Sequence, residues 1–231
     1  MTEALRSDRA VDFVMTLKGA GGNRLQEIFE LCRGRNVPMR QEPRERLDRI
    51  TNGAVHQGVV AAVAPKAYAT LDAVLDDAAG NAMLVVLDGV EDPHNLGAIV
   101  RSAHAAGATA IVIPERRSAR LTDTVAKAAA GAVEHLPVVR GNINRSLELL
   151  KRHNFWIYGL DERGEQDYYE MDYRGNIAFV LGGEGQGLHH LTAKNCDFVV
   201  RIPMAGAIAS LNVSVVAVSL KKKAVRQRRR G

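Results

Sequence analysis

Cysteine, aromatic residues and long apolar runs are all scarce in this chain of 231 residues. The two cysteines, Cys32 and Cys196, stand far apart and match no metal-ligand spacing, so we expect reduced, buried thiols and no metal site. The longest apolar runs, such as Ala82–Leu87 and Ile177–Leu181, are much shorter than the ~20 residues of a membrane span. The first ten residues contain no apolar core of a signal peptide. These absences predict a cytoplasmic protein that binds neither a metal nor a membrane.

The composition is otherwise that of a folded globular protein. Hydrophobic residues make up 46% of the chain and charged residues 25%, which excludes a disordered or fibrous chain. At roughly 100–200 residues per domain, the length allows one large domain, or one ordinary domain and a small one.

Positive charge is concentrated at one end of the sequence. The formal net charge is +5, and residues 221–230 carry seven basic side chains and no acidic ones. Without this tail the net charge would be −2, so the basicity is a local feature. Such a cluster attracts polyanions, of which a nucleic-acid phosphate backbone is the commonest in a cell. A solvated tail that only improves solubility is the alternative.

A proline-containing linker at about 65–70 divides the chain into segments 1–65 and 70–231. Pro65 follows the apolar run at 59–64 and disfavours helix before it. In the first segment, apolar periodicity predicts a small α/β module with about three strands. Its expected strands are Val11–Leu17, Val37–Arg40 and Gly58–Ala64, and its expected helices are Asn23–Arg35 and Arg44–Ile50.

In the second segment, predicted strands alternate with helices, which indicates βαβ units and a parallel α/β sheet. The expected strands are Met83–Leu87, Ala110–Ile113, Leu136–Val139, Phe155–Leu160, Ile177–Leu181 and Phe198–Ile202. The expected helices are Leu96–Ala106, Asp123–Ala132, one capped by Asn142 or Asn144 that ends near His153, and a long closing helix over Leu211–Arg228. Parallel sheets bind ligands at the carboxyl ends of their strands. We therefore look for chemistry in the loops after Leu87, Leu160, Leu181 and Ile202.

The loop after Leu87 is rich in turn formers and leads into a helix that carries Asn95 and Arg101. Backbone N–H groups at a helix start favour anions, and the guanidinium fork suits phosphate. A capped turn with a salt-bridged arginine would be the structural alternative.

The loop after Leu181 is glycine-rich, and Glu184 is its one acidic residue. Its glycines allow a ligand to approach the backbone, but their spacing fits neither G-x-G-x-x-G nor a P-loop, and a plain tight turn is the alternative. In the segment after Ile202, Ser210 is a natural helix cap with Asn212 two residues further on. Taken alone, this third segment is explained by capping.

Together, in this order and spacing, the three segments resemble the signature motifs of the SpoU (TrmH-like) family of RNA ribose 2′-O-methyltransferases. The motifs are D-G-V-E-D-P-H-N-L-G-A-I-V-R-S-A at 88–103, V-L-G-G-E-G-Q-G-L at 180–188 and I-P-M-A-G-A-I-A-S-L-N-V-S-V at 202–215. The resemblance covers residues 82–220. The first segment is similar to the family's L30e-like RNA-binding module, which ends H-Q-G-V-V-A, here at 56–61. The closest resemblance is to the bacterial methyltransferases that modify a guanosine of 23S rRNA.

This resemblance implies an α/β protein in which a small L30e-like module precedes a parallel-sheet SPOUT domain with a C-terminal trefoil knot. It also implies a homodimer and S-adenosylmethionine as cofactor, bound by Gly182, Ile202 and Leu211. The polar residues that match the family's catalytic set are Asn95, Arg101, Glu184, Ser210 and Asn212. A guanidinium is almost never deprotonated in proteins, so we expect Arg101 to clamp a phosphate and orient the ribose hydroxyl.

The sequence departs from the family pattern in two places. It starts at Glu3-Ala4-Leu5 of the family's opening G-x-H-x-V-x-E-A-L, so we expect the first strand of the module to be missing. The closing helix carries Lys221-Lys222-Lys223 where an apolar or mixed face is expected. A tRNA methyltransferase and a non-catalytic RNA-binding protein remain alternatives. The failed glycine fingerprint argues against a nucleotide-dependent oxidoreductase.

Overall fold

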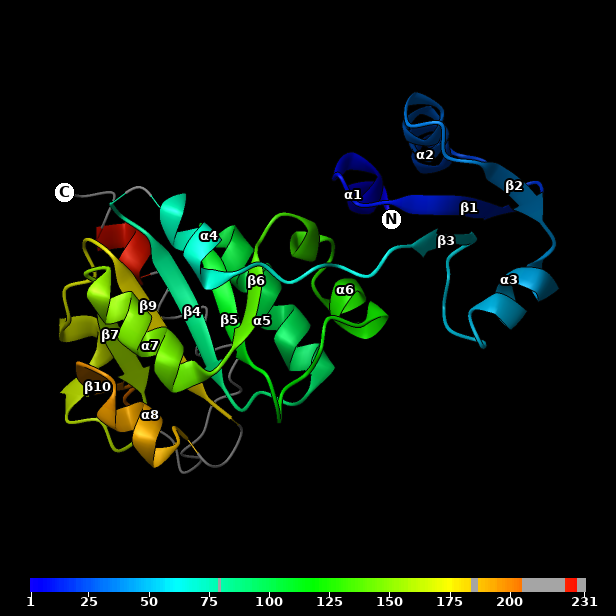
Figure 1. Ribbon diagram of the computed structural model, residues 1–231. Helices are drawn as coiled ribbons and strands as arrows, with labels where there is room; N and C mark the ends of the chain where they lie inside the picture. Colours follow the sequence, from blue (N-terminus) through cyan, green and yellow to red (C-terminus); the bar gives the residue numbers. More distant parts are fainter. Residues whose placement is uncertain (79, 184–186, 205–222, 228–231) are drawn as a thin grey trace. The chain divides into compact units, whose positions relative to one another are not determined.

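The computed structural model describes residues 1–78, 80–183, 187–204 and 223–227 (Figure 1). The chain consists of two compact units, Met1–Lys66 and Ala67–Gly231. Each unit has its own sheet and its own buried core.

The first unit is built on a three-stranded sheet in the order β2-β1-β3. Its strands are β1 (Val11–Leu17), β2 (Met39–Glu42) and β3 (Val59–Val63), and its helices are α1 (Thr2–Arg6), α2 (Asn23–Gly34) and α3 (Arg44–Ile50). The central strand β1 runs parallel to β2 and antiparallel to β3. The predicted α/β module with three strands is confirmed. Its second strand starts at Met39 and not at Val37, because Pro38 has no N–H to donate.

Helix α1, which the sequence did not predict, is held to the unit by one arginine. The Arg35 guanidinium donates, at 2.7–3.2 Å, to the carbonyl oxygens of Ala4, Leu5, Ser7 and Arg9. These are the carbonyl groups at and beyond the end of a five-residue helix, which cannot satisfy them internally.

In the second unit, the described residues form seven parallel strands in the order β6-β5-β4-β9-β7-β10-β8. The strands are β4 (Met83–Asp88), β5 (Ala110–Pro114), β6 (Val138–Gly141), β7 (Trp156–Leu160), β8 (Gln166–Asp167), β9 (Ile177–Gly182) and β10 (Phe198–Arg201). The helices are α4 (Leu71–Asp76), α5 (Pro93–Ala105), α6 (Asp123–Ala128), α7 (Ile143–Arg152) and α8 (His190–Lys194), with 3-10 turns η1 (Ala132–Glu134) and η2 (Tyr168–Glu170). The predicted parallel α/β sheet is confirmed.

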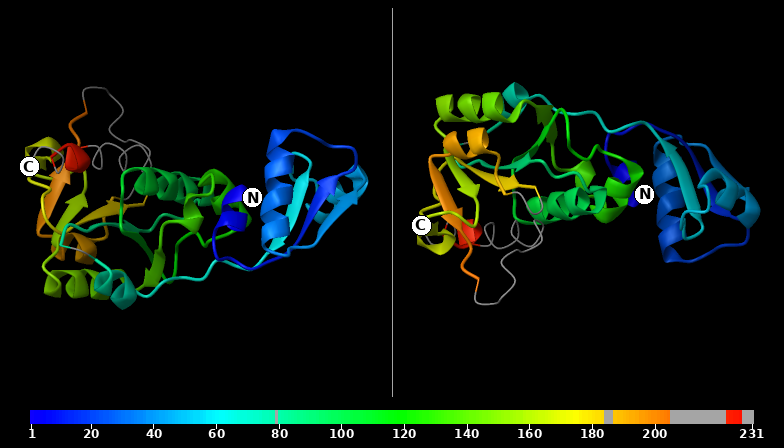
Figure 2. Two further views of the ribbon diagram at one scale, coloured as in Figure 1. Left: turned by 90° about the horizontal axis from the view of Figure 1, so that it is seen from above. Right: turned by 90° about the horizontal axis from the view of Figure 1, so that it is seen from below.

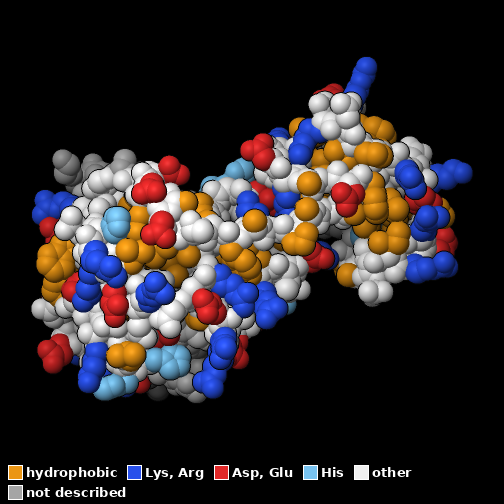
Figure 3. All heavy atoms as spheres, in the orientation of Figure 1, with side chains coloured by type: hydrophobic (Ala, Val, Ile, Leu, Met, Phe, Trp, Pro, Cys, Tyr) orange, Lys and Arg blue, Asp and Glu red, His pale blue; other side chains and the backbone are white. Residues whose placement is uncertain are grey.

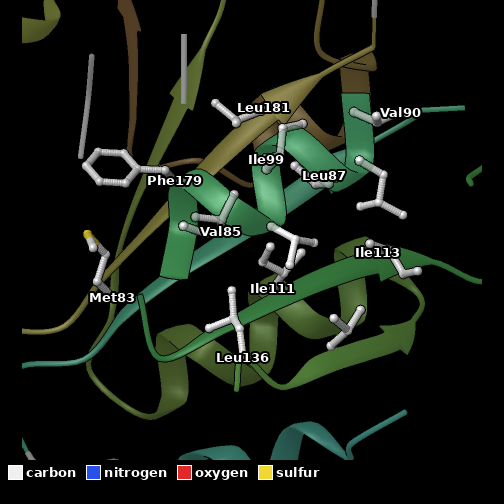
Figure 4. Close-up of a cluster of buried hydrophobic side chains, with 14 of the residues drawn as sticks. Met83, Val85, Leu87, Val90, Ile99, Ile111, Ile113, Leu136, Phe179 and Leu181 are labelled. Atoms are coloured by element: carbon white, nitrogen blue, oxygen red, sulfur yellow. The ribbon is translucent and has the colours of Figure 1, made fainter. Parts of the chain in front are cut away.

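Helices cover both faces of this sheet (Figure 2). Along β4, Met83, Val85 and Leu87 join the core beneath α5 and α6, which Figure 4 shows, whereas Leu84 and Val86 join the core beneath α4 and α7. All six residues of β4 are buried, as expected for a strand covered on both faces.

Several element bounds differ from the prediction for local reasons. Helix α5 starts at Pro93, because the Asp92 carboxylate caps it by accepting the His94 N–H at 2.9 Å. Helix α6 ends at Ala128, earlier than the predicted Ala132. The helix cannot continue to Ala132, because Gly131 takes a left-handed φ of +91°. Elements β8, α4 and α8 were missed because two to six residues carry little periodicity. Asn142, and not Asn144, caps α7.

The predicted closing helix over 211–228 lies mostly outside the described residues, but 223–227 is helical. Ala224 is fully buried, and the Gln227 side chain bonds to the Tyr173 N–H at 2.9 Å and the Met171 carbonyl at 2.8 Å. Ala224 and the Gln227 side-chain amide therefore hold this short helix against the second unit. They do so although the helix carries Lys223 and has no continuous apolar face.

Both cysteines are free thiols, as predicted. Cys32 is buried in the first unit, whereas Cys196 is only partly buried in the second, and burial raises the pKa of the Cys196 thiol to about 12. A thiol with so high a pKa is a poor nucleophile.

Helices α5 and α6 cross in close contact at Gly97. A Cβ on Gly97 would lie 2.4 Å from the Ala128 Cβ and 2.8 Å from the Val125 carbonyl oxygen. This glycine of the first motif is therefore required by packing, and it fixes the helix that carries Asn95 and Arg101.

We expect Gly97→Ala to lower the free energy of unfolding by about 1–3 kcal/mol, because the new methyl group forces α5 and α6 apart. Urea denaturation followed by the fluorescence of Trp156, the single tryptophan, measures this. Gly141→Ala is the control, since its Cβ would meet only the Ser146 hydroxyl, at 3.6 Å. An unchanged unfolding midpoint in Gly97→Ala would contradict the packing role.

Candidate active site

The carboxyl ends of β4, β9, β7 and β10 lie side by side at one edge of the sheet. Asp88 at the end of β4 is opposite Gly182 at the end of β9, and Leu181 is opposite Leu160 of β7. On the far side of β7, the Asp161 N–H donates to the Val200 carbonyl of β10 at 3.1 Å. The four loops selected from the sequence therefore all start at the carboxyl ends of four neighbouring strands.

Asn95 and Arg101 both lie on α5, the helix that follows the first of these loops. Asn95 is half-buried in the first turn and Arg101 is exposed. Six residues of helix separate them by about 9 Å along the axis and about 120° around it. They share one helix but lie nearly two turns apart.

The two ends of the glycine-rich segment after β9 lie against each other. Gly183 and Gly187 form an antiparallel bridge, and a Cβ on Gly182 would lie 2.1 Å from the Gly187 carbonyl oxygen. A Cβ on Gly183 would lie 2.6 Å from the carbonyl oxygen of Gly89 in the first motif. The glycines are thus required by backbone-to-backbone contact. Glu184 lies outside the described residues.

Asp161, directly after β7, is a buried carboxylate that our sequence reasoning did not select. Its Oδ2 accepts the Leu188 N–H at 3.0 Å, and the Arg163 guanidinium donates to Oδ1 at 2.6 Å and to Oδ2 at 2.7 Å. The hydrogen bond from the Arg163 side chain, helped by the Leu188 and Arg163 amides, lowers the pKa of Asp161 to about 2, although burial opposes the shift. Asp161 is therefore ionised at neutral pH.

Asp88 is the second such carboxylate, at the end of β4. Its Oδ2 accepts the His189 N–H at 3.0 Å and lies 3.0 Å from Nδ1 of the same residue. Both Asp88 and Asp161 directly follow an apolar strand that ends at the predicted site edge, and that position was the signal available in the sequence.

Of the third motif, the structure describes the first residues only. Ile202 follows β10 and is half-buried against the core below α5. Ser210, Leu211 and Asn212 lie outside the described residues. Within the described residues, no group of three or more His, Cys, Asp or Glu side chains could hold a metal ion. Nor is any helix there long and apolar enough to cross a bilayer.

Two family models match the chain. The model of the SpoU rRNA methylase family matches residues 82–220, and a model for the RNA 2′-O ribose methyltransferase substrate-binding domain matches residues 1–69. The chain belongs to the SpoU family. The 23S rRNA (guanosine-2′-O-)-methyltransferase RlmB of Xylella fastidiosa is 45% identical over 219 residues, which are 93% of this chain and 88% of the relative. The TrmH-family protein YacO of Bacillus subtilis is 41% identical over 230 residues, 98% of this chain and 92% of YacO.

Solved structures of this family share the fold. The SpoU methyltransferase AviRb from Streptomyces viridochromogenes, solved in complex with AdoMet, has a TM-score of 0.86 at 24% identity, and the match covers 100% of this chain and 88% of AviRb. A crystal structure of an RNA 2′-O ribose methyltransferase has a TM-score of 0.80 at 26% identity, covering 98% and 84%. Family membership confirms the enzyme class that the motifs predict, an RNA methyltransferase that uses S-adenosylmethionine.

The described residues at this end of the sheet would be compatible with such a cofactor. Gly182, Gly183 and Gly187 are half-exposed and present backbone groups without side chains, and the half-buried Ile202 offers an apolar wall. The space for a Cβ at Gly182 is filled by Gly187, so contacts from Gly182 to a ligand would use its backbone.

We expect Gly182→Ala to weaken S-adenosylmethionine binding by more than ten-fold, about 1.4 kcal/mol, because the loop cannot close over the added methyl group. Isothermal titration calorimetry measures the dissociation constant. Gly141→Ala again serves as control and should bind like the wild type. Wild-type affinity in Gly182→Ala would show that closure at Gly182 is dispensable for the cofactor site.

Proposed function

We propose that this protein methylates the ribose 2′-oxygen of a guanosine in 23S rRNA. The observation that carries this substrate is the 45% identity, over 93% of the chain, to an enzyme named for that reaction. The substrate-binding model over residues 1–69 supports a role for the first unit in recognising RNA. We accordingly assign residues 1–65 to RNA binding and residues 70–231 to methyl transfer, and infer a cytoplasmic location from the substrate.

S-adenosylmethionine, when bound, supplies an electrophilic methyl group on a positively charged sulfur. Gly182, Ile202 and Leu211 would hold it at the carboxyl edge of the sheet. The work left to the chain is alignment of the ribose hydroxyl and removal of its proton. For this we propose Asn95, Arg101, Glu184, Ser210 and Asn212, as the family motifs imply.

Arg101 is suited to bind RNA because no described acidic side chain neutralises its charge. Within the described residues it makes no ion pair, whereas Arg163, Arg174 and Arg201 each pair with an aspartate. A guanidinium presents a cationic fork of N–H donors, so Arg101 would bind a phosphate beside the reacting ribose and orient the 2′-hydroxyl.

We further propose that the C-terminal segment forms the family's trefoil knot and that the protein is a homodimer. The SpoU membership supports both proposals. Size-exclusion chromatography with light scattering tests the dimer.

Mapping of ribose methylation in ribosomal RNA, with and without the gene, tests the proposed reaction. One guanosine of 23S rRNA should lose its 2′-O-methyl group when the gene is absent. Loss of a methyl group from tRNA instead would overturn the assigned substrate. No change in any RNA would contradict the activity.

We expect Arg101→Ala to lower kcat on the order of 100-fold and to leave the cofactor dissociation constant almost unchanged, because Arg101 faces the RNA. Arg101→Lys should also fail, since a point charge cannot replace a bidentate fork. Arg152→Ala, at the exposed end of α7, is the control and should keep wild-type turnover. Normal turnover by Arg101→Lys would show that charge alone suffices.

The basic tail should add affinity for RNA without selecting the nucleotide. On the face shown in Figure 3, basic and acidic side chains are interspersed, whereas residues 221–230 carry no acidic group. Phosphate contacts position a protein on nucleic acid but carry little sequence information. If three or four charges engage single-stranded phosphates, at ~0.7 each, the salt slope is about −2 to −3.

Replacing the seven basic residues of 221–230 with Gln should flatten that slope and raise the RNA dissociation constant, with the methylated position unchanged. The variant retains Ala224 and Gln227, which dock the segment. An unchanged slope and affinity would identify a tail that serves solubility only. Circular dichroism must show a folded variant.

A further inference from the structure

Two carboxylates from neighbouring strands hold the point where the glycine-rich loop returns to the sheet. The loop leaves the sheet at Gly182, the last residue of β9, which lies between β4 and β7, and comes back against the ends of these two strands at Leu188 and His189. Asp161, after β7, accepts the Leu188 N–H, and Asp88, at the end of β4, accepts the His189 N–H, both at 3.0 Å. Two successive amides are thus fixed from opposite sides of β9.

Asp161 also explains the last glycine of the second motif. Gly187 takes a φ of +65°, and a Cβ there would lie 2.5 Å from Oδ2 of Asp161. Only a residue without a side chain can bring the loop this close to the carboxylate. The side chain of Asp161 is only 2% exposed, so its contacts to Leu188 and Arg163 replace solvent.

The same local arrangement occurs elsewhere in the chain without a loop to hold. Asp172 accepts the Arg174 N–H at 3.1 Å and pairs with the Arg174 guanidinium, as Asp161 does with Arg163. The Asp172 side chain is 58% exposed, and it makes no bond to the described residues of the glycine-rich loop. The Asp-x-Arg turn therefore does not need contact with the loop in order to form. At Asp161 the same turn makes one further contact, the hydrogen bond from the Leu188 N–H.

We propose that Asp161 is a positioning residue of the cofactor site, whose carboxylate sets the place where the glycine-rich loop returns, with Asp88 as its counterpart on the other side. The proposal rests on the proposed function for the ligand of that loop. Asp161 acts through the loop backbone. An ionised acceptor suits the task, because hydrogen bonds to a charged group are about twice as strong as neutral ones.

Asp161→Asn keeps the size of the side chain but replaces one acceptor oxygen by an NH2 group that faces N–H donors. We expect the KM and the dissociation constant for S-adenosylmethionine to rise about ten-fold or more, as for loss of a charge-assisted hydrogen bond. The kcat at saturating cofactor should stay near the wild-type value. Asp172→Asn, which disturbs the same turn away from the loop, should change neither constant.

If Asp161 only stabilised the fold, Asp161→Asn would lower kcat and leave KM unchanged, because a smaller fraction of the protein would be folded. That result would overturn the proposal. If Asp161→Asn does not fold, Arg163→Ala decides, because it removes the exposed partner that orients the carboxylate. It should raise the cofactor KM, and an unchanged KM would overturn the proposal.

Amide hydrogen exchange without cofactor separates this proposal from the proposed function. Asp161→Asn should speed exchange at Leu188, Asp88→Asn should speed it at His189, and Asp172→Asn should affect neither. If the wild type binds no S-adenosylmethionine but these exchange changes occur, the proposed function fails while the anchoring of the loop stands. Unchanged exchange at Leu188 in Asp161→Asn would refute the anchoring itself.

Discussion

The parallel pairing of β4 with β9 is the constraint on which the rest of the site depends. Six consecutive residue pairs, from Met83 with Ile177 to Asp88 with Gly182, bring the end of the first motif's strand beside the start of the glycine-rich loop. A slip of one residue would turn the side chains of β9 to the opposite faces of the sheet. Because both strands are almost entirely buried, the two cores fix this register, and the register places the loops.

At the carboxyl ends of these strands, glycines let backbone segments approach one another closely, and carboxylates accept hydrogen bonds from the backbone that has come close. Gly183 lies against the backbone of the first motif, and Gly187 lies against Asp161. The lowered pKa of Asp161 has a consequence for stability, because a carboxyl with a depressed pKa in the folded state stabilises that state only when ionised. Its contribution is complete above the ordinary pKa near 3.8 and is lost as the pH falls towards 2.

The alternation of apolar strands with helices was sufficient to predict the parallel sheet, and apolar periodicity was sufficient to predict the small first module. Bounds shifted where one residue decided them, as at Pro38 and Gly131. The resemblance selected loops that the sheet does bring together, at Asp88, Gly182 and Ile202. The position of Asp161 after an apolar strand was visible in the sequence, but its bond to Leu188 was not, because 27 residues separate the partners and nothing local indicates that strands β7 and β9 are neighbours. The roles of the eight site residues remain predictions: Asn95, Arg101, Gly182, Glu184, Ile202, Ser210, Leu211 and Asn212.

The strand order also constrains how the polypeptide can fold as it leaves the ribosome. The Ala82 N–H, just before β4, bonds to the side chain of Asn176, 94 residues later, so the middle of the large sheet cannot close until β9 has emerged. The first unit needs no such distant partner, since its three strands lie within the first 63 residues. Sheets with pairings this remote fold slowly, and their apolar strands stay exposed meanwhile. During synthesis, β4, β5 and β6 can pair with one another before β9 emerges, whereas β7, which pairs with β9 and β10, has no partner until then. We therefore expect the apolar residues of β7 to stay exposed the longest as the chain is made.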